Sequence, residues 1–101
     1  MIARIWHGRT KAEHLNLYSE FLQQRAVPDY GQTQGFKGLV FLRQVKGEEA
    51  HFKLITYWEN EESISAFAGV DIKKAKYYRE DDDFLLEKEE TVEHYDVFEM
   101  I

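Results

Sequence analysis

The sequence predicts an α+β domain whose elements follow the order strand, helix, strand, strand, helix, strand. Stretches rich in β-branched and aromatic residues alternate with stretches whose apolar residues recur every three to four positions. Residues 52–67 also join a strand directly to a capped helix, which is typical of small α+β domains. The chain has 101 residues, the size of one domain, so we expect residues 1–101 to fold as a single unit.

The first predicted strand spans residues 2–7, and we expect Gly8 to end it. Alternation along a strand places Ile2, Arg4 and Trp6 on one face. An arginine inside a strand is either an exposed edge residue or a clamp for an anion. Its two apolar neighbours on the same face favour the clamp.

The first predicted helix is amphipathic. Thr10 and Glu13 have the spacing of a capping box, so we expect Thr10 to be the N-cap. Pro28, the only proline, is expected to end or kink the helix near Val27.

A hairpin is predicted in the middle of the chain. Residues 29–35 form a polar connection, and residues 36–43 and 50–58 are β-rich on either side of a turn at residues 46–49. The second helix follows directly over residues 61–68.

The start of the second helix carries the clearest capping signal in the chain. Asn60 is a good N-cap, Ser63 occupies the third helical position, and Gly69 is a suitable C-cap. Asp71 is then expected to cap a short helix over residues 72–79.

The end of the chain is predicted to hold an acidic loop and a last strand. Residues 80–83 read as a solvated acidic loop, and residues 91–98 form the final strand. The order of elements is that of the ferredoxin-like split βαβ fold, a four-stranded antiparallel sheet with helices on one face.

The sheet is apolar on both faces. Leu54 and Trp58 lie on one side of the third strand, and Ile55 and Tyr57 on the other. A strand that is apolar on both faces needs cover on both, and the helices cover only one. We therefore predict a homodimer in which a second copy covers the open face.

The composition excludes several classes of function. The formal net charge is −6 and no basic stripe is present, so neither nucleic acid nor a membrane is an expected partner. There is no cysteine, which excludes disulfides and thiolate chemistry. The first residues contain no apolar signal core, and we expect a cytoplasmic protein.

The histidines have no metal-ligand spacing, so no metal site is predicted. His14 and His51 are expected to be solvated. His94 lies within the last strand, where a structural histidine is somewhat favoured over a catalytic one. If the first and last strands pair, Arg4 approaches His94 and the two would bind and deprotonate an acidic hydroxyl.

The aromatic residues offer two interpretations. Trp6 and Trp58 are either plain core or part of a pocket. Tyr77 and Tyr78 are adjacent on the predicted helix, so at most one points fully inward.

Four stretches together resemble the antibiotic biosynthesis monooxygenase domain family: residues 1–6, residues 36–38, residues 57–67 and residues 92–97. The resemblance implies a dimeric α+β barrel with a pocket between sheet and helices in each subunit. Some members of that family oxidise phenols with molecular oxygen and no metal or flavin, so the resemblance implies a small aromatic or quinol-type substrate and no cofactor.

The same resemblance implies which residues form the pocket. Trp6, Trp58, Phe67 and a tyrosine of the predicted helix, Tyr77 or Tyr78, would bind the substrate. Arg4 and His94 would be its catalytic polar groups.

Haem-degrading relatives in the same superfamily suggest an alternative. They use an asparagine on the first strand, a tryptophan on the third and a helical histidine that binds iron. Trp58 matches the tryptophan, whereas the other positions fall near Trp6 and His7 and on Tyr77. Tyrosine also ligates haem iron in some proteins, so haem binding stays open. A third reading is a non-enzymatic small-molecule-binding dimer.

Overall fold

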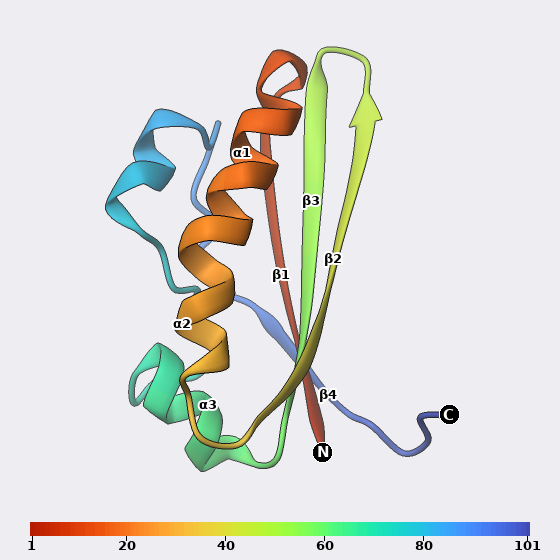
Figure 1. Cartoon of the computed structure of the whole chain (residues 1–101), viewed down its shortest axis with the longest axis vertical. Helices are drawn as coiled ribbons and strands as arrows, with labels where there is room; N and C mark the ends of the chain where they lie inside the picture. The colour runs from red at the N-terminus through yellow and green to blue at the C-terminus, as the bar shows by residue number, and fades with distance from the viewer.

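The computed structural model describes residues 1–101 and shows a four-stranded antiparallel sheet with helices packed on one face (Figure 1). The strand order is β2-β3-β1-β4. The elements are β1 (Ile2–Lys11), η1 (Ala12–His14), α1 (Leu15–Phe21), η2 (Leu22–Ala26), α2 (Val27–Gly31), β2 (Phe36–Lys46), β3 (Glu49–Trp58), α3 (Glu61–Ala68), η3 (Arg79–Asp83) and β4 (Glu93–Asp96). The predicted ferredoxin-like α+β fold is confirmed.

Strand β1 is longer than predicted, because Gly8 does not end it. The indole of Trp6 folds over the backbone of Gly8. A Cβ atom at this glycine would lie 2.3 Å from Cη2 of that indole, closer than two carbon atoms can approach. Gly8 therefore gives the tryptophan room instead of terminating the strand.

The first helical region begins and continues differently from the prediction. Thr10 belongs to β1 and its hydroxyl donates to the carbonyl of Lys11, so it is not an N-cap. Pro28 does not end the helix near Val27. The π-helical segment η2 precedes it, and Pro28 lies in the first turn of α2, where a missing N–H breaks no helical hydrogen bond. The helical path runs on to Gly31.

The predicted N-terminus of α3 is confirmed. The N–H of Ser63 donates to Oδ1 of Asn60 over 2.9 Å, and the N–H of Asn60 donates to Oγ of Ser63 over 3.3 Å. Gly69 follows as the C-cap with φ near +100°, a conformation that side chains disfavour. This local signal was sufficient because both partners lie within four residues of each other.

The predicted helix over residues 72–79 does not form, and Tyr77 and Tyr78 lie on an irregular segment. The guanidinium of Arg4 donates hydrogen bonds to the carbonyls of Ile72 and Lys74, which in a helix would accept from backbone N–H groups of the same segment. The segment's backbone is thus paired with distant groups instead of with itself.

The acidic stretch at residues 80–83 is not a solvated loop throughout. It forms η3, and Asp81 within it is only 2% exposed. Its carboxylate accepts hydrogen bonds from the hydroxyl of Tyr18 over 2.8 Å and from the backbone N–H of Tyr78 over 2.7 Å. Burial of this one acidic residue fastens η3 to α1.

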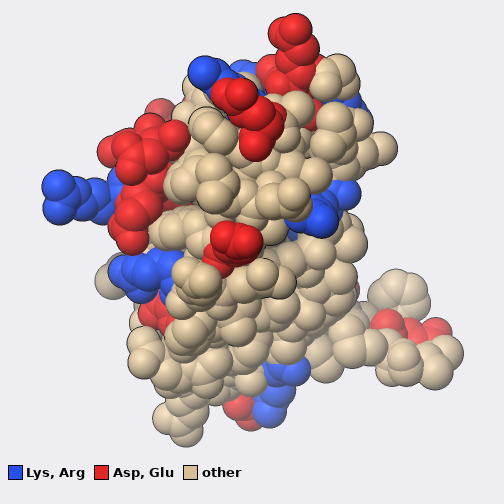
Figure 2. Space-filling view, turned by 45° about the horizontal axis from the view of Figure 1, so that its top comes forward, with Lys and Arg blue, Asp and Glu red and all other residues tan.

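The last strand is shorter than predicted: the N–H of Val97 still donates to the carbonyl of Met1 over 2.9 Å, and residues 98–101 leave the sheet. Figures 1 and 2 show this tail projecting from the body, and the side chain of Phe98 is fully exposed. On the face drawn in Figure 2, charged side chains of both signs surround broad uncharged areas.

The core lies between the sheet and the helices. Its buried apolar residues are Trp6, Tyr18, Leu22, Ala26, Tyr30, Ala50, Phe52, Leu54, Trp58, Ile64, Phe67 and Val92. The opposite sheet face carries no covering element, and Val40, Leu42 and Tyr95 remain 43%, 45% and 53% exposed there. None of the helices is both long enough and apolar enough to span a membrane.

We predict that Gly8→Ala destabilises the protein by about 1–3 kcal/mol, because the buried Trp6 indole must move away from the new methyl group. Denaturant unfolding measures the loss. Gly31→Ala is the matched control, since a Cβ atom there meets nothing within 4 Å. Equal stability of the two variants would show that the indole does not need the glycine.

Candidate functional site

The aromatic residues predicted to line a pocket do lie on the helix-covered face, but they pack against one another. Trp6 meets Tyr77 edge to face with ring centroids 6.1 Å apart. Trp58 packs on Phe67 at 5.4 Å and is completely buried. Tyr78 is half-buried beside α1. These contacts are those of a hydrophobic core.

The interior cavity between sheet and helices has a volume of only about 20 Å³. Its lining includes Trp6, Tyr18, Tyr30, Phe67, Tyr78 and Asp81. Such a volume holds about one water molecule. The indole N–H of Trp6 is the one buried side-chain donor lining this cavity that has no hydrogen-bond partner. The pocket expected from the sequence is filled by its own lining.

Arg4 and His94 contact each other, as predicted from the pairing of β1 with β4. An Nη1 N–H of Arg4 lies 3.1 Å from Nε2 of His94. Arg4 is 3% exposed, and the carbonyls of Ile72 and Lys74 accept from it over 2.5 and 2.9 Å. The guanidinium is therefore used as a clamp between chain segments, and a catalytic role for the pair stays a prediction.

Electrostatics keeps His94 neutral. Burial, and then the charge of Arg4, lower the pKa of this imidazole. Burial lowers the pKa of the Arg4 guanidinium too, but an arginine stays charged at any ordinary pH. Because the arginine donates to Nε2, the ring proton of His94 belongs on Nδ1.

The phenols of the interior are all protonated at neutral pH. The hydroxyl of Tyr77 donates to the carbonyl of Glu89, and burial raises the pKa of Tyr77 to about 12. The hydroxyl of Tyr78 donates to Asp29 over 2.6 Å, and burial raises its pKa further. In this arrangement neither tyrosine offers the phenolate that would bind iron.

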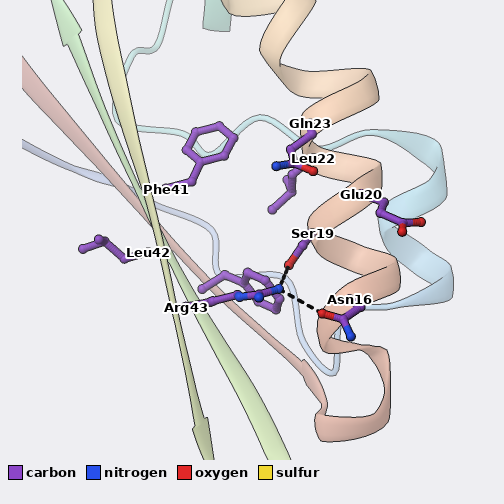
Figure 3. A pocket seen from close by; sticks show the side chains of 9 residues that line it. Asn16, Ser19, Glu20, Leu22, Gln23, Phe41, Leu42 and Arg43 are labelled. Atoms are coloured by element: carbon purple, nitrogen blue, oxygen red, sulfur yellow. Dashed lines mark hydrogen bonds between the residues drawn. The ribbon is translucent and has the colours of Figure 1, made fainter.

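A much larger hollow lies between α1 and β2, and we call it the α1–β2 groove (Figure 3). Its volume is about 520 Å³, and it is lined by Asn16, Ser19, Glu20, Leu22, Gln23, Phe41, Leu42, Arg43 and Phe52. None of the residues predicted to form the site lies there. Alternation along β2 places Phe41 and Arg43 on the helix side, and that pattern was the available signal.

Arg43 spans the groove. Its Nη1 donates to Oγ of Ser19 over 2.8 Å and to Oδ1 of Asn16 over 3.2 Å, as the dashed lines in Figure 3 show. Both acceptors are neutral. The arginine is thus a cation held at a ligand-sized hollow by exchangeable hydrogen bonds.

His51 and His14 are only partly exposed, because each ring packs against another ring instead of being fully solvated as predicted. The ring of His51 lies beside that of His7 on the open sheet face. The ring of His14 packs edge-on against Phe84 with centroids 5.5 Å apart. No group of three or more histidine, cysteine, aspartate or glutamate side chains is arranged to hold a metal ion.

Comparison with solved structures finds two that share the fold. The chain superposes over its whole length on MhuD, a haem degrader from Mycobacterium tuberculosis with two haems in its active site, at 21% identity and TM-score 0.66, covering 99% of that chain. It also matches an arginine-to-serine mutant of MhuD with two manganese protoporphyrin IX molecules per active site, at 20% identity, TM-score 0.61 and 98% coverage. All of the present chain is covered in both matches.

At this level of identity the likeness shows the fold alone. No protein-family description matches the chain, and no curated protein matches it. The expectation from the sequence that this protein uses no cofactor is nevertheless contradicted by the comparison. Both structural neighbours hold a porphyrin in their active sites, so the sequence resemblance to cofactor-free oxygenases was too narrow a guide.

We predict that Asp81 makes stability depend on pH. Burial raises the pKa of its carboxyl above the unfolded value of ~3.9, so ionisation costs free energy in the folded state only. That cost is present above the folded pKa and disappears as the pH falls towards the unfolded one. Relative to Asp81→Asn, wild-type protein should therefore gain stability between about pH 7 and pH 4.

Denaturant unfolding of both proteins across that range measures the difference. Asp82→Asn, which changes an exposed neighbour, is the matched control and should show no such gain. A difference between wild type and Asp81→Asn that stays constant with pH would contradict the prediction.

Proposed function

We propose that this protein binds haem or a closely related porphyrin as its ligand or substrate. The observation that carries the proposal is the match, over the full chain, to two structures with porphyrins in their active sites. The aromatic interior and the α1–β2 groove are the two places where such a ligand would lie.

Volume favours the α1–β2 groove. Pockets for drug-sized ligands measure roughly 300–1,000 Å³, and the groove has about 520 Å³. The interior cavity, at about 20 Å³, would have to lose the core contacts of Trp6 and the hydrogen bonds of Tyr78 before it admitted a porphyrin. Binding in the groove would require only that Arg43 exchange its hydrogen bonds to Asn16 and Ser19 for hydrogen bonds to the ligand.

The chemistry of the groove suits a porphyrin ring with carboxylate arms. Phe41 and Leu42 provide apolar surface for the ring, and the buried Leu22 and Phe52 lie behind it at the floor of the groove. Arg43 is the cation that would pair with a carboxylate, and such charge-assisted hydrogen bonds are stronger than its present ones to neutral oxygens. Glu20 would repel a carboxylate, but Figure 3 shows it pointing away from the strand.

The groove offers no strong ligand for iron. Its lining contains no histidine, tyrosine, methionine or cysteine. Binding there would rest on the ring and its carboxylates, so the metal would add little to affinity. This separates the groove from the interior, where the phenols and His94 lie.

We predict that metal-free protoporphyrin IX binds within a few-fold of the affinity for hemin, and that Arg43→Gln weakens both by about tenfold, the effect of losing one charge-assisted contact of about 1.5 kcal/mol. Porphyrin fluorescence anisotropy and Soret absorbance measure the two affinities. Lys37→Gln, which removes an exposed cation on the same strand, is the matched control.

Two results would contradict parts of this proposal. Absence of binding of either porphyrin would remove haem as the ligand class. Binding of hemin alone, lowered by Tyr77→Phe but unchanged by Arg43→Gln, would move the site to the interior.

A second candidate is a non-enzymatic binding protein, and the filled interior favours it. Arg4 and His94 would then be structural. Following the Soret band of bound hemin after adding an electron donor separates the two: a stable spectrum supports binding alone, and loss of the band that His94→Gln slows supports an enzyme.

We also propose that a second copy of the chain covers the open sheet face. The half of that face formed by Ile5, Val40, Ile55 and Tyr57 is apolar and partly or fully exposed, and no element of the same chain covers it. Exposed apolar patches of this kind mark interaction surfaces. An uncharged patch on the flat face of a sheet is suited to packing against its own copy.

We predict that Val40→Lys converts a dimer into a monomer, because it places a charge beside Ile55 within the proposed interface. Sedimentation equilibrium measures the mass. Val45→Lys is the control, since Val45 lies on the same strand with similar exposure but on the other face. A monomeric wild-type protein, or dimers in both variants, would contradict the interface.

A further inference from the structure

A histidine pair on the open sheet face has an arrangement that the sequence did not suggest. His7 of β1 and His51 of β3 lie on adjacent strands, diagonally across the register. Nε2 of His7 is 3.1 Å from Nδ1 of His51, and the ring centroids are 5.4 Å apart. The two side chains are 35% and 25% exposed, so solutes reach them.

Each ring has a carboxylate on its far nitrogen. Oε2 of Glu89 lies 2.5 Å from Nδ1 of His7, and Oε1 of Glu49 lies 3.3 Å from Nε2 of His51. Ionised carboxylates only accept hydrogen bonds, so His7 carries a proton on Nδ1, and its Nε2, which faces His51, presents a lone pair. Nδ1 of His51 either donates to that lone pair or, in the tautomer with the proton on Nε2 towards Glu49, presents a second lone pair.

In that second tautomer the two facing lone pairs can hold a metal ion between them. Metal-bound histidines almost always donate their other N–H to a carboxylate or carbonyl; His7 has that partner in Glu89, and Glu49 lies 3.3 Å from the corresponding nitrogen of His51. With metal–nitrogen distances of ~2.0–2.1 Å, a nitrogen separation of 3.1 Å corresponds to an angle of about 100° at the metal. That angle suits two neighbouring ligands of a transition-metal ion.

The charges around the pair are mixed. Arg9 holds Glu49 over 2.7 Å and Glu87 over 3.2 Å, which fixes one of the two orienting carboxylates in place. Beside the rings lies a hollow of about 390 Å³ whose lining includes Lys46 and Lys53. The hollow gives water or an anionic ligand access to the remaining coordination positions, and the two lysines favour an anion there.

We propose that His7 and His51 form a two-histidine site for a divalent transition-metal ion of the Zn²⁺, Ni²⁺ or Cu²⁺ class, with Glu89 and Glu49 positioning the rings. Imidazole is a preferred ligand for these ions. The two histidines lie on the opposite sheet face from the α1–β2 groove, although Leu42, Arg43 and Phe52 line both that groove and the hollow beside the rings. The site lies in the charged half of the open sheet face, beyond the apolar half proposed to pack on a second copy.

Calorimetric titration of untagged protein with Zn²⁺ tests the proposal. Wild-type protein should bind one ion per chain, and His7→Gln and His51→Gln should each abolish that binding. His14→Gln is the matched control, because it removes a histidine on another element and should leave binding unchanged. Far-UV circular dichroism of each variant verifies the fold.

Glu89→Gln tests the positioning role. It should lower Zn²⁺ affinity by roughly 10–100-fold without abolishing binding, the usual effect of losing a carboxylate that orients a ligand. The electron paramagnetic resonance spectrum of added Cu²⁺ should show two coupled nitrogens in wild type, and this signal should be absent in His51→Gln.

Three results would overturn the proposal. The first is that folded wild-type protein binds no Zn²⁺, which leaves a shared proton between the rings. The second is that His14→Gln loses binding to the same extent. The third is that both His7→Gln and His51→Gln bind Zn²⁺ as wild type does.

Discussion

The burial of a single cation, Arg4, determines how the second half of the chain lies on the sheet. A guanidinium that is 3% exposed must find acceptors, because an unpaired buried charge costs several kcal/mol. The nearest acceptors are the carbonyls of Ile72 and Lys74 and the ring of His94. Those contacts draw the segment after α3 and the last strand onto the same place on β1.

The shape of the interior follows from that clamp. With its carbonyls held by Arg4, the segment at residues 72–78 stays irregular and lies against the sheet and helices. It brings Tyr77 onto Trp6 and Tyr78 beside Asp29, and it leads into η3, where Asp81 is buried against Tyr18. The interior is thus filled from this side, which leaves the α1–β2 groove as the larger hollow.

Much of the fold was predictable because its signals are local. Strand alternation and the capping box of Asn60 and Ser63 involve residues a few positions apart, and both appear in the structure. The failures involve distant partners. Gly8 was interpreted as a stop because nothing in the sequence shows that an indole folds over it. Residues 72–79 were predicted as a helix because Arg4, which donates to the carbonyls of Ile72 and Lys74, lies about seventy residues away.

The candidate sites show the same division. Contact between Arg4 and His94 was predictable, because strand pairing alone brings them together. The α1–β2 groove was missed because a hollow depends on how far a helix stands from a strand, a distance that no residue pattern encodes. His51 was assigned to solvent because a position near a hairpin turn does not reveal the neighbouring ring of His7, whose strand is over forty residues away.

The alternation of β1 explains how one small sheet separates two kinds of chemistry. Trp6 and His7 are neighbours in sequence, yet they point to opposite faces. Trp6 points to the helix side, where the core excludes water and the α1–β2 groove adjoins it. The open side receives an imidazole within reach of solvent, carboxylates and a second imidazole. Because the two side chains cannot exchange faces without a register shift of the whole strand, a porphyrin bound on one side and a metal ion bound on the other would occupy separate sites.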